Sequence, residues 1–276
     1  MTDYLVYDVF TDRPFGGNPL AIIPNAAEVP EERLQRIARE FNFSETVFLY
    51  PPEGDGVAKV RIFTPTMEVP FAGHPVIGTV VMLGEAGLGP AFTLELGIGP
   101  MAVRIEDGRA SFENREPLEH TATPDKALIA RALGTPEGTI LGEPIMAGVG
   151  LPFTFTEVVD RAALSDLVPE TSAFREGATR YPSSLDFAQC VYTRVDGRIH
   201  MRMFAPLDNI PEDPATGSAA AGLGALLCRE AGAPVNLTIH QGEDMGRPSL
   251  IEVEAEPGRV TVSGRAIRVM EGKLVL

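Results

Sequence analysis

The stretch "RMFAPLDNIPEDPATGSA", residues 202–219, has an earlier counterpart in "RIFTPTMEVPFAGHPVIG", residues 61–78. Four residues of the first copy have an identical residue 141 positions later in the second copy. Arg61, Phe63, Pro65 and Pro70 match Arg202, Phe204, Pro206 and Pro211. A slip of three residues then aligns Gly73-His74 with Gly217-Ser218. Both copies predict a strand, a proline-containing loop and a helix. The sequence therefore indicates an internal duplication.

The helix that follows each loop is predicted to be buried. Pro75 to Leu83 is apolar nearly all round, and Gly217 to Glu230 is rich in alanine and glycine. A helix that is apolar on every side packs inside a protein. Pro30 to Phe41 instead carries its apolar residues on one stripe, which predicts an outer helix. We therefore expect two similar lobes, with the loops before their buried helices facing one cleft.

Short apolar runs between turn residues predict the strands. In the first half they lie at 5–10, 20–23, 46–49, 58–63, 92–96, 102–105 and 110–112. In the second half they lie at 153–159, 190–195, 198–204, 237–241, 249–253, 260–263 and 265–271. Two more helices are predicted at 125–133 and 161–167. The chain is predicted to be of the α/β (α+β) class.

Composition narrows the classes of function. The 276 residues are 44% hydrophobic, enough for a sizeable core, and the formal net charge of −15 predicts a surface that repels nucleic acid and anionic membranes. The two cysteines, Cys190 and Cys228, are predicted to be core residues and suit a reducing compartment. The acidic start "MTDYLVYDVF" does not resemble a signal peptide, and no apolar run reaches the length of a membrane span. We expect a cytoplasmic protein.

The loop "EDPATGS", residues 212–218, predicts a helix whose first backbone groups are uncovered. Pro214 suits a helix start, and Thr216 or Ser218 could cap the helix. Gly217 has no side chain to cover the first N–H groups, which attract anions together with the positive end of the helix dipole. The alternative is a close helix–strand contact with an ordinary cap, and both interpretations fit this stretch.

Two titratable residues of the first half are candidates for chemistry. His74 follows Gly73 at a predicted helix start, where the pKa of the imidazole is lowered and the ring tends to be neutral. Glu45 precedes an apolar strand in "FNFSETVFLY", and a partly buried carboxylate there could act as a general acid and base. The alternatives are a structural capping histidine and a solvated glutamate at a sheet edge.

The sequence carries no motif that indicates a cofactor-binding site. "GIGPMA", residues 97–102, fits a dinucleotide pattern, but Pro100 and the strand pattern that follows do not supply the required helix. The sequence contains no P-loop and no G-x-S-x-G motif, and its four histidines lack metal-ligand spacing. We expect neither a cofactor nor a metal.

Five collinear motifs resemble those of the phenazine-biosynthesis PhzF-like family, whose members are related to diaminopimelate epimerase. They are "DVFTDRPFGGNPLAII", "IAREFNFSETVFL", "RIFTPTMEVPFAGHPVIGT", "RMFAPLDNIPEDPATGSAAAG" and "QGEDMGRPS". The resemblance implies two pseudo-symmetric α/β lobes, each a curled, mostly antiparallel sheet or barrel around a central helix. The N-terminal lobe would cover residues 1–118, completed by 264–276, and the C-terminal lobe residues 119–263.

The same resemblance implies a site. Glu45 matches the family's acid/base, and His74 and Asp213 match the residues that assist it. Four further positions match those that hold the substrate, chiefly its carboxylate: Ser44, Gly73, Gly217 and Ser218. Asp208 lies before the EDPATGS loop. The aspartate of the family therefore matches Asp213 and not Asp208. Neither loop carries the cysteine of diaminopimelate epimerases, which excludes a two-thiol racemase mechanism.

The function that the resemblance implies is a cofactor-independent isomerase that moves a proton on carbon in a small carboxylate substrate. The best characterised family activity is the isomerisation of trans-2,3-dihydro-3-hydroxyanthranilate. One alternative is a one-base epimerase or racemase of an amino acid, and another is a carboxylate-binding protein without turnover. The family also implies a homodimer.

Overall fold

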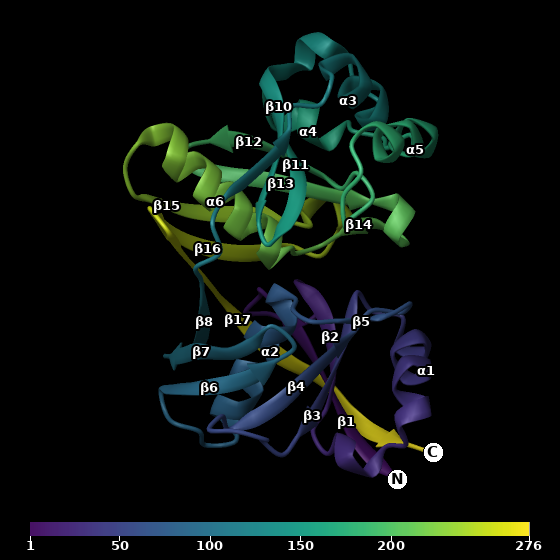
Figure 1. Ribbon diagram of the computed structural model, residues 1–276, viewed down its shortest axis with the longest axis vertical. Helices are drawn as coiled ribbons and strands as arrows, with labels where there is room; N and C mark the ends of the chain where they lie inside the picture. Colours follow the sequence, from purple (N-terminus) through teal and green to yellow (C-terminus); the bar gives the residue numbers. More distant parts are fainter. Residues whose placement is uncertain (276) are drawn as a thin grey trace. The chain divides into compact units, whose positions relative to one another are not determined.

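The computed structural model describes residues 1–275, and the chain divides into two compact units (Figure 1). The first unit is Met1–Glu113 together with the chain from Ser263 onward, and the second is Asn114–Val262. One long strand, β17 (Arg259–Leu274), contributes residues to both units.

The described part of the first unit contains nine strands and two helices. In chain order they are β1 (Thr2–Val9), β2 (Asn18–Ile23), α1 (Glu31–Phe41), β3 (Glu45–Tyr50), β4 (Ala58–Phe63), β5 (Glu68–Val69), α2 (Gly73–Glu85), β6 (Ala91–Leu96), β7 (Gly99–Glu106), β8 (Arg109–Asn114) and the later part of β17. A short 3-10 turn at Ala26–Glu28 precedes α1.

The second unit repeats this order with extra helices. It contains β9 (Glu119–Ala122), α3 (Lys126–Leu133), β10 (Ile140–Val149), β11 (Leu151–Val158), α4 (Arg161–Ser165), α5 (Thr171–Arg180), β12 (Gln189–Val195), β13 (Arg198–Ala205), β14 (Ile210–Asp213), α6 (Gly217–Ala231), β15 (Val235–Gln241), β16 (Ser249–Glu256) and the start of β17. Short 3-10 turns lie at Glu137–Thr139, Pro206–Asp208 and Glu243–Met245.

Eight strands of the first unit close into a barrel around α2 (Figure 1). The ring runs through β1, β2, β3, β4, β6, β7, β8 and β17 and returns to β1. Helix α2 packs against β1, β2, β3 and β7, and its residues from Gly73 to Met82 are all buried. The prediction of a buried helix inside the first lobe is therefore confirmed, because a helix enclosed by strands needs apolar residues on every side.

The second unit pairs its strands in the same sequence. The pair β11–β12 is parallel like β2–β3, and β13–β15 is parallel like β4–β6, while the neighbouring pairs are antiparallel in both units. Helix α6 packs against β10, β11, β15 and β16, and its residues from Ala219 to Gly224 are buried. The predicted fold of two pseudo-symmetric lobes, each a sheet around a central helix, is confirmed.

The strand register corrects the sequence alignment of the two copies. Val69 pairs with Ile62 in the first unit, and Asp213 pairs with Met203 at the corresponding place in the second. The three extra residues of the second copy therefore lie in the loop after β13, which contains a 3-10 turn. In the first copy they are missing from the loop before Glu68. The match of Pro70 with Pro211 was wrong, because the register aligns Pro70 with Pro214.

Several elements differ from the sequence prediction. Strands β9 and β10 and helix α5 were not predicted; Pro144 and a register shift between Leu141 and Ile145 hide the alternation of β10. The two strands expected at the end of the chain are one strand, β17. Gly264 is no break, because a Cβ there would lie 2.3 Å from Cδ1 of Phe10, whose ring packs against the strand.

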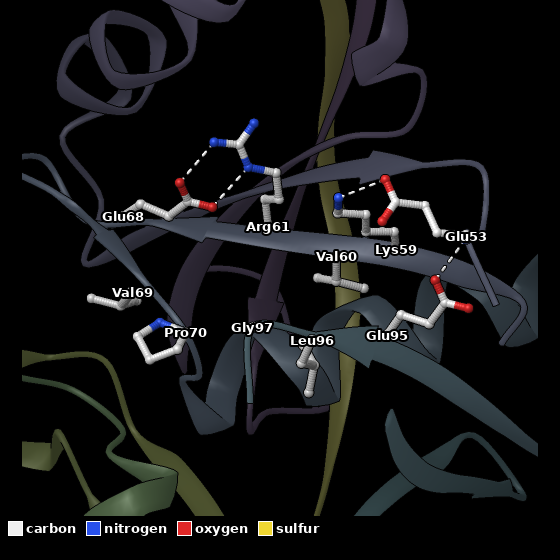
Figure 2. Close-up of a pocket in the computed structure, with 10 residues that line it drawn as sticks. All are labelled: Glu53, Lys59, Val60, Arg61, Glu68, Val69, Pro70, Glu95, Leu96 and Gly97. Atoms are coloured by element: carbon white, nitrogen blue, oxygen red, sulfur yellow. Dashed lines mark hydrogen bonds and ion pairs between the residues drawn. The ribbon is translucent and has the colours of Figure 1, made fainter. Parts of the chain in front are cut away.

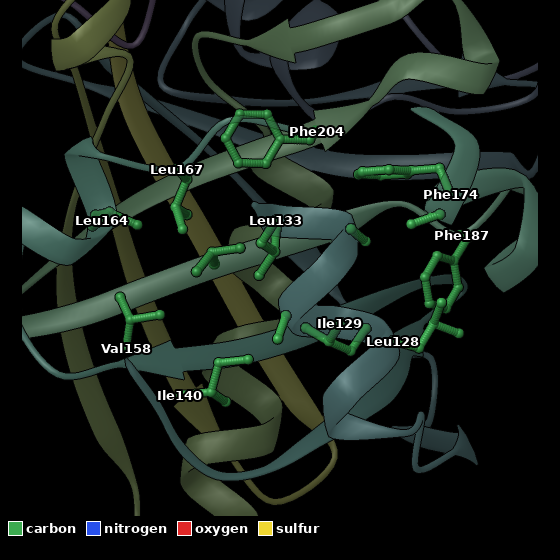
Figure 3. Packing of buried hydrophobic residues seen from close by; sticks show 14 residues of the cluster. Leu128, Ile129, Leu133, Ile140, Val158, Leu164, Leu167, Phe174, Phe187 and Phe204 are labelled. Atoms are coloured by element: carbon green, nitrogen blue, oxygen red, sulfur yellow. The ribbon is translucent and has the colours of Figure 1, made fainter. Parts of the chain in front are cut away.

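Helices α3, α4 and α5 cover an apolar cluster on the sheet of the second unit (Figure 3). Phe174 and Phe187 meet edge to face, with ring centroids 6.2 Å apart, and Phe204 of β13 joins the same cluster. This layer lies on the face of β13 that carries the even-numbered residues, while the odd-numbered ones, such as Met201 and Met203, alternate to the other face. Within residues 1–275, the helices are all too short or too polar to cross a lipid bilayer.

Candidate active site

Glu45 and His74 meet in the first unit. Glu45 is the first residue of β3 and pairs with Leu20 of β2, while His74 is the second residue of α2. The imidazole Nδ1 of His74 lies 3.2 Å from Oε2 of Glu45, and the two side chains are only 5% and 15% exposed. Residues that are 29 positions apart in the sequence thus form a buried carboxylate–imidazole pair, which we call the first half-site.

Burial keeps the imidazole of His74 uncharged. Desolvation lowers the pKa of His74 to about 3, although a hydrogen bond to the Pro19 carbonyl opposes this shift. The prediction of a neutral histidine is confirmed, but burial is the main cause, where the sequence had suggested the helix terminus. A neutral imidazole has one N–H donor and one nitrogen acceptor, so it can orient a carboxylate or relay a proton.

The loop that leads into β2 supplies contacts to the first half-site. Asn18 is fully buried, and the Ser44 hydroxyl lies 3.5 Å from its Oδ1 atom. The carbonyl of the next residue, Pro19, accepts the hydrogen bond from His74. Asn18 and Pro19 were not among the residues expected in the site. Both residues belong to "GGNP", which lies inside one of the five motifs. This short sequence has no titratable group that would mark it as part of a site.

Helix α2 begins at Gly73, beside this pair. Its N-cap residue is Ala72, with extended backbone, and within residues 1–275 no side chain caps the helix there. The first amides of a helix lack intrahelical partners, so an uncapped start next to a glycine offers N–H donors to an anion. Ser44 precedes Glu45 in the chain and Gly73 precedes His74, so all four residues belong to the first unit.

Asp213 lies at the centre of a polar cluster in the second unit, which we call the second half-site. It ends β14 and is 5% exposed. The Thr216 hydroxyl donates to its Oδ2 atom at 2.6 Å. The expectation that Thr216 or Ser218 caps α6 was wrong. Thr216 stands at the N-cap position, but its hydroxyl is directed to Asp213, and among the described residues no side chain provides the cap bond.

Gln241 fixes the loop that carries Asp213. Its side-chain N–H₂ donates to the Asp213 carbonyl at 2.7 Å and to the Thr216 hydroxyl at 3.0 Å, and its Oε1 atom accepts from the Thr216 amide at 3.0 Å. Ser249 adds a bond of 2.7 Å to the Pro214 carbonyl. Gln241 and Ser249 were not predicted as site residues. They bracket the "QGEDMGRPS" motif, and only the structure shows that this motif supports the loop before α6.

Helix α6 opens with Gly217 and Ser218, directly after this cluster. Gly217 is buried, and Ser218 is half-buried. The Thr216 hydroxyl is bonded to Asp213 and does not cap α6. The first amides of α6, like those of α2, can therefore donate hydrogen bonds to a bound ligand. The seven predicted site residues thus form two groups, each assembled within one unit, and each group includes the glycine that starts a buried helix.

A separate pocket of about 550 Å³ lies on the first unit, between β4, β5 and β6 (Figure 2). Its charged side chains all have partners within the first unit. Arg61 makes a two-pronged ion pair with Glu68 at 2.7 Å, Lys59 pairs with Glu53 at 2.8 Å, and Glu95 accepts hydrogen bonds from backbone amides. Glu45 and His74 are not among its lining residues. Among the residues that the structure describes, acidic, histidine and cysteine side chains form no group of three or more that could hold a metal ion.

The fold and these half-sites define a class of two-lobed α/β proteins whose lobes each surround a helix. A solved structure of this class, described as a "Predicted Epimerase" from Pseudomonas aeruginosa, superposes with a TM-score of 0.84 at 30% identity and covers 100% of both chains. The family model for phenazine biosynthesis-like proteins, PhzC-PhzF, matches residues 7–272, and the chain belongs to this family.

Two curated relatives extend the comparison over full length. The chain is 36% identical to trans-2,3-dihydro-3-hydroxyanthranilate isomerase of Pseudomonas aeruginosa, with 100% of both chains covered. It is 38% identical to an uncharacterized isomerase of Mesorhizobium japonicum, with 99% of both covered. The resemblance drawn from the five motifs is therefore confirmed along the whole chain.

Proposed function

We propose that the protein is an isomerase that moves a proton from one carbon to another in a small carboxylate substrate. The observation that carries this proposal is the buried contact between Glu45 and His74, 3.2 Å long. The activity named for the relative from Pseudomonas aeruginosa, isomerisation of trans-2,3-dihydro-3-hydroxyanthranilate, supports the reaction class and supplies the first substrate to test.

Glu45 is proposed to take the proton and to return it. Removing a proton from carbon requires a base held within hydrogen-bonding reach of that proton. A permanently charged imidazolium beside Glu45 would weaken the carboxylate as a base. Since the pKa of His74 is lowered to about 3, its imidazole is neutral near pH 7, and Glu45 is spared this effect.

The remaining site residues are proposed to bind the carboxylate and stabilise negative charge. Loss of a proton next to a carboxylate pushes electron density onto the carboxylate oxygens, so fixed N–H donors there lower the barrier. The amides at Gly73 of α2 and at Gly217 and Ser218 of α6 are suitable donors. Ser44 would hold the substrate beside Glu45, and Asp213 would orient a substrate amine or hydroxyl.

The proposal is tested by following protons directly. Purified protein is incubated with trans-2,3-dihydro-3-hydroxyanthranilate in D₂O, after dialysis against a chelator and without added cofactor, and the products are examined by NMR. The expected result is product formation with catalysed exchange at carbon. Glu45→Gln should abolish both, whereas Glu40→Gln, an exposed acid on α1, should retain them. Turnover only after a cofactor is restored would contradict cofactor independence.

A second candidate function is a one-base epimerase of an amino acid, and the full-length similarity to the structure described as a predicted epimerase favours it. The same NMR experiment on a panel of amino acids separates the two. An epimerase inverts one stereocentre while the constitution of its substrate stays the same, but an isomerase of the first kind moves a double bond. Binding of carboxylates without exchange at carbon would instead identify a binding protein.

Assembly and location complete the proposal. Family resemblance supports a homodimer, which light scattering coupled to size-exclusion chromatography would detect as twice the chain mass of 29.6 kDa. Both cysteines are unpaired and buried, which suits work in the reducing cytoplasm. A stable monomer at micromolar concentration would contradict the dimer.

A further inference from the structure

The barrel of the first unit has one end where the first half-site lies. Asn18 begins β2 and Glu45 begins β3 at this end, because the two strands are parallel and Leu20 pairs with Glu45. Phe63 ends β4 at the same level, opposite Thr46. The loops that precede β2 and follow β4 therefore lie at this end, which we call the site end.

Loops near the site end expose large apolar side chains. Phe15 in the loop before β2 is 69% exposed, Met67 in the loop after β4 is 59% exposed, and Ile98 in the turn after β6 is 57% exposed. The turn with Ile98 is held against the loop before α2, since a Cβ on Gly97 would lie 2.7 Å from Cα of Pro70. Single exposed apolar residues are common on proteins, so exposure alone carries no conclusion. Phe15 differs from the other two in how its backbone is held.

Phe15 adopts a left-handed backbone with φ of 67°, which is unfavourable for a bulky side chain. Its amide donates to Oδ2 of Asp8 at 2.7 Å, and Asp8 is 2% exposed. A buried carboxylate thus fixes the main chain at Phe15. Left-handed backbone in a non-glycine residue persists only where the surroundings hold it, and it concentrates at binding sites.

The rest of the loop connects Phe15 to residues that contact Ser44 and His74. Gly17 has φ of 60°, and a Cβ there would lie 2.2 Å from the Val9 carbonyl oxygen, so the loop folds tightly back on β1. Asn18, three residues after Phe15, contacts Ser44, and Pro19 binds His74 through its carbonyl. The loop that holds Phe15 therefore leads directly into Asn18 and Pro19, which contact Ser44 and His74.

We propose that Phe15 is a substrate-binding residue that packs against the apolar face of a ring-bearing carboxylate. The inference rests on the proposed function. Helix amides and Ser44 can recognise only the polar edge of such a substrate, and its ring needs an apolar contact to exclude water from the carbon that gives up its proton. An aromatic side chain held on a rigid loop provides a flat surface for that ring at little entropic cost.

Four proteins test this inference: the wild type, Phe15→Asn, Phe15→Leu and Met270→Ala. Asparagine tolerates left-handed backbone, so Phe15→Asn keeps the loop while removing the apolar ring. Leucine restores apolar contact without an aromatic face. Met270 of β17 is 52% exposed and pairs with Val6, away from the site end, so its truncation controls for the loss of exposed apolar surface.

The measurement is the dissociation constant for two stable probes, 3-hydroxyanthranilate and the ringless carboxylate lactate, by isothermal titration calorimetry. We expect the wild type to prefer the ring-bearing probe. Phe15→Asn should weaken binding of that probe at least tenfold and change lactate binding less than threefold. Phe15→Leu should lie between Phe15→Asn and the wild type, Met270→Ala should match the wild type, and melting temperatures should agree within two degrees.

Three results overturn the inference: no preference of the wild type for the ring, an unchanged affinity in Phe15→Asn, or an equal loss for both probes. Turnover of trans-2,3-dihydro-3-hydroxyanthranilate by the wild type is measured separately. If turnover is seen but Phe15→Asn binds the ring probe normally, only the role of Phe15 fails. If Phe15 supports ring binding but no turnover occurs, only the proposed isomerisation fails.

Discussion

Val69 occupies in the first unit the strand position that Asp213 occupies in the second. Both are the last residue of a short strand and both pair with the equivalent residue of the preceding strand, Ile62 and Met203 respectively. By the same registers, Ala188 stands where Glu45 stands, since Thr46 and Gln189 pair with Phe63 and Phe204. The duplicated fold is symmetric, but its acidic groups are not.

This asymmetry yields a matched pair of variants. We expect Asp213→Asn to lower kcat by about 10²-fold or more, because the carboxylate is buried and bonded to Thr216, whereas Val69→Ala should leave kcat within a few-fold of the wild type. Steady-state kinetics and circular dichroism on both variants provide the measurement. Equal losses in the two variants would show that the position serves folding rather than chemistry.

Glu45→Gln is expected to eliminate proton transfer while preserving binding. Glutamine keeps the size and the hydrogen-bonding capacity of glutamate but cannot accept the proton. A general acid and base contributes about 10²–10⁴-fold to rate, and more where one group carries the only transferred proton. Stopped-assay NMR gives the rate and calorimetry the affinity for 3-hydroxyanthranilate. A rate near that of the wild type would remove Glu45 from the mechanism.

Much of the site was predictable because its parts are local signals. Apolar residues on every side predict each buried helix, and the glycine at its start predicts a helix terminus that no side chain covers. Family resemblance placed Glu45 and His74 in one site but did not predict their contact. The barrel brings them together, because the first residue of β3 and the first turn of α2 lie at one end of it.

What the sequence missed depends on contacts between distant segments. Gln241 supports Asp213 from 28 positions away, and a neutral amide gives no signal of its own. The pKa of His74 is lowered mainly by burial and not by the helix terminus. Only the folded barrel shows how deeply His74 is buried. Strand β10 was hidden because Gly142 and Pro144 interrupt its alternation where the pairing with β11 shifts.

His74 should make stability fall as the pH is lowered below its unfolded-state pKa. The pKa is about 3 in the folded protein, and unfolded histidine has a pKa of about 6.5. Between these values the unfolded state binds the additional proton, so acid favours unfolding; the contribution is fully present above pH 6.5. Between pH 7 and pH 5 the loss attributable to His74 is about 2 kcal/mol.

Urea unfolding of the wild type and His74→Asn at pH 7 and pH 5 measures this linkage. The wild type should lose more stability between the two pH values than His74→Asn does. His120→Asn serves as the control, since His120 is exposed. Identical pH dependence in the wild type and His74→Asn would mean that His74 is not buried in its neutral form.

Thiol reagents should leave activity intact. Cys190 and Cys228 are both buried, and burial raises the pKa of Cys190, so little thiolate forms for a reagent to attack. We expect the two thiols to react with Ellman's reagent only after denaturation. Rapid inactivation of the folded enzyme by iodoacetamide, prevented by 3-hydroxyanthranilate, would place a cysteine in the site and contradict the prediction.

Gly217→Val should weaken carboxylate binding by covering the first amides of α6. Gly217 is the first residue of the helix and is buried, and the Thr216 hydroxyl is bonded to Asp213 rather than to these amides. The helix dipole contributes about 0.3–1 kcal/mol to an anion at this position, and charge-assisted hydrogen bonds from the amides add to it. Loss of these contacts should raise the dissociation constant for 3-hydroxyanthranilate about tenfold or more.

Ser218→Ala separates the backbone donors from the side chain beside them. It removes a hydroxyl but leaves every amide of α6 in place, so we expect a smaller loss of affinity than with Gly217→Val. Calorimetric titration gives the affinities, and thermal melting shows whether the valine is accommodated in the fold. A folded Gly217→Val protein that binds carboxylates as tightly as the wild type would mean that the N-terminus of α6 does not hold the ligand. A larger loss with Ser218→Ala would assign the binding to the hydroxyl instead of the helix amides.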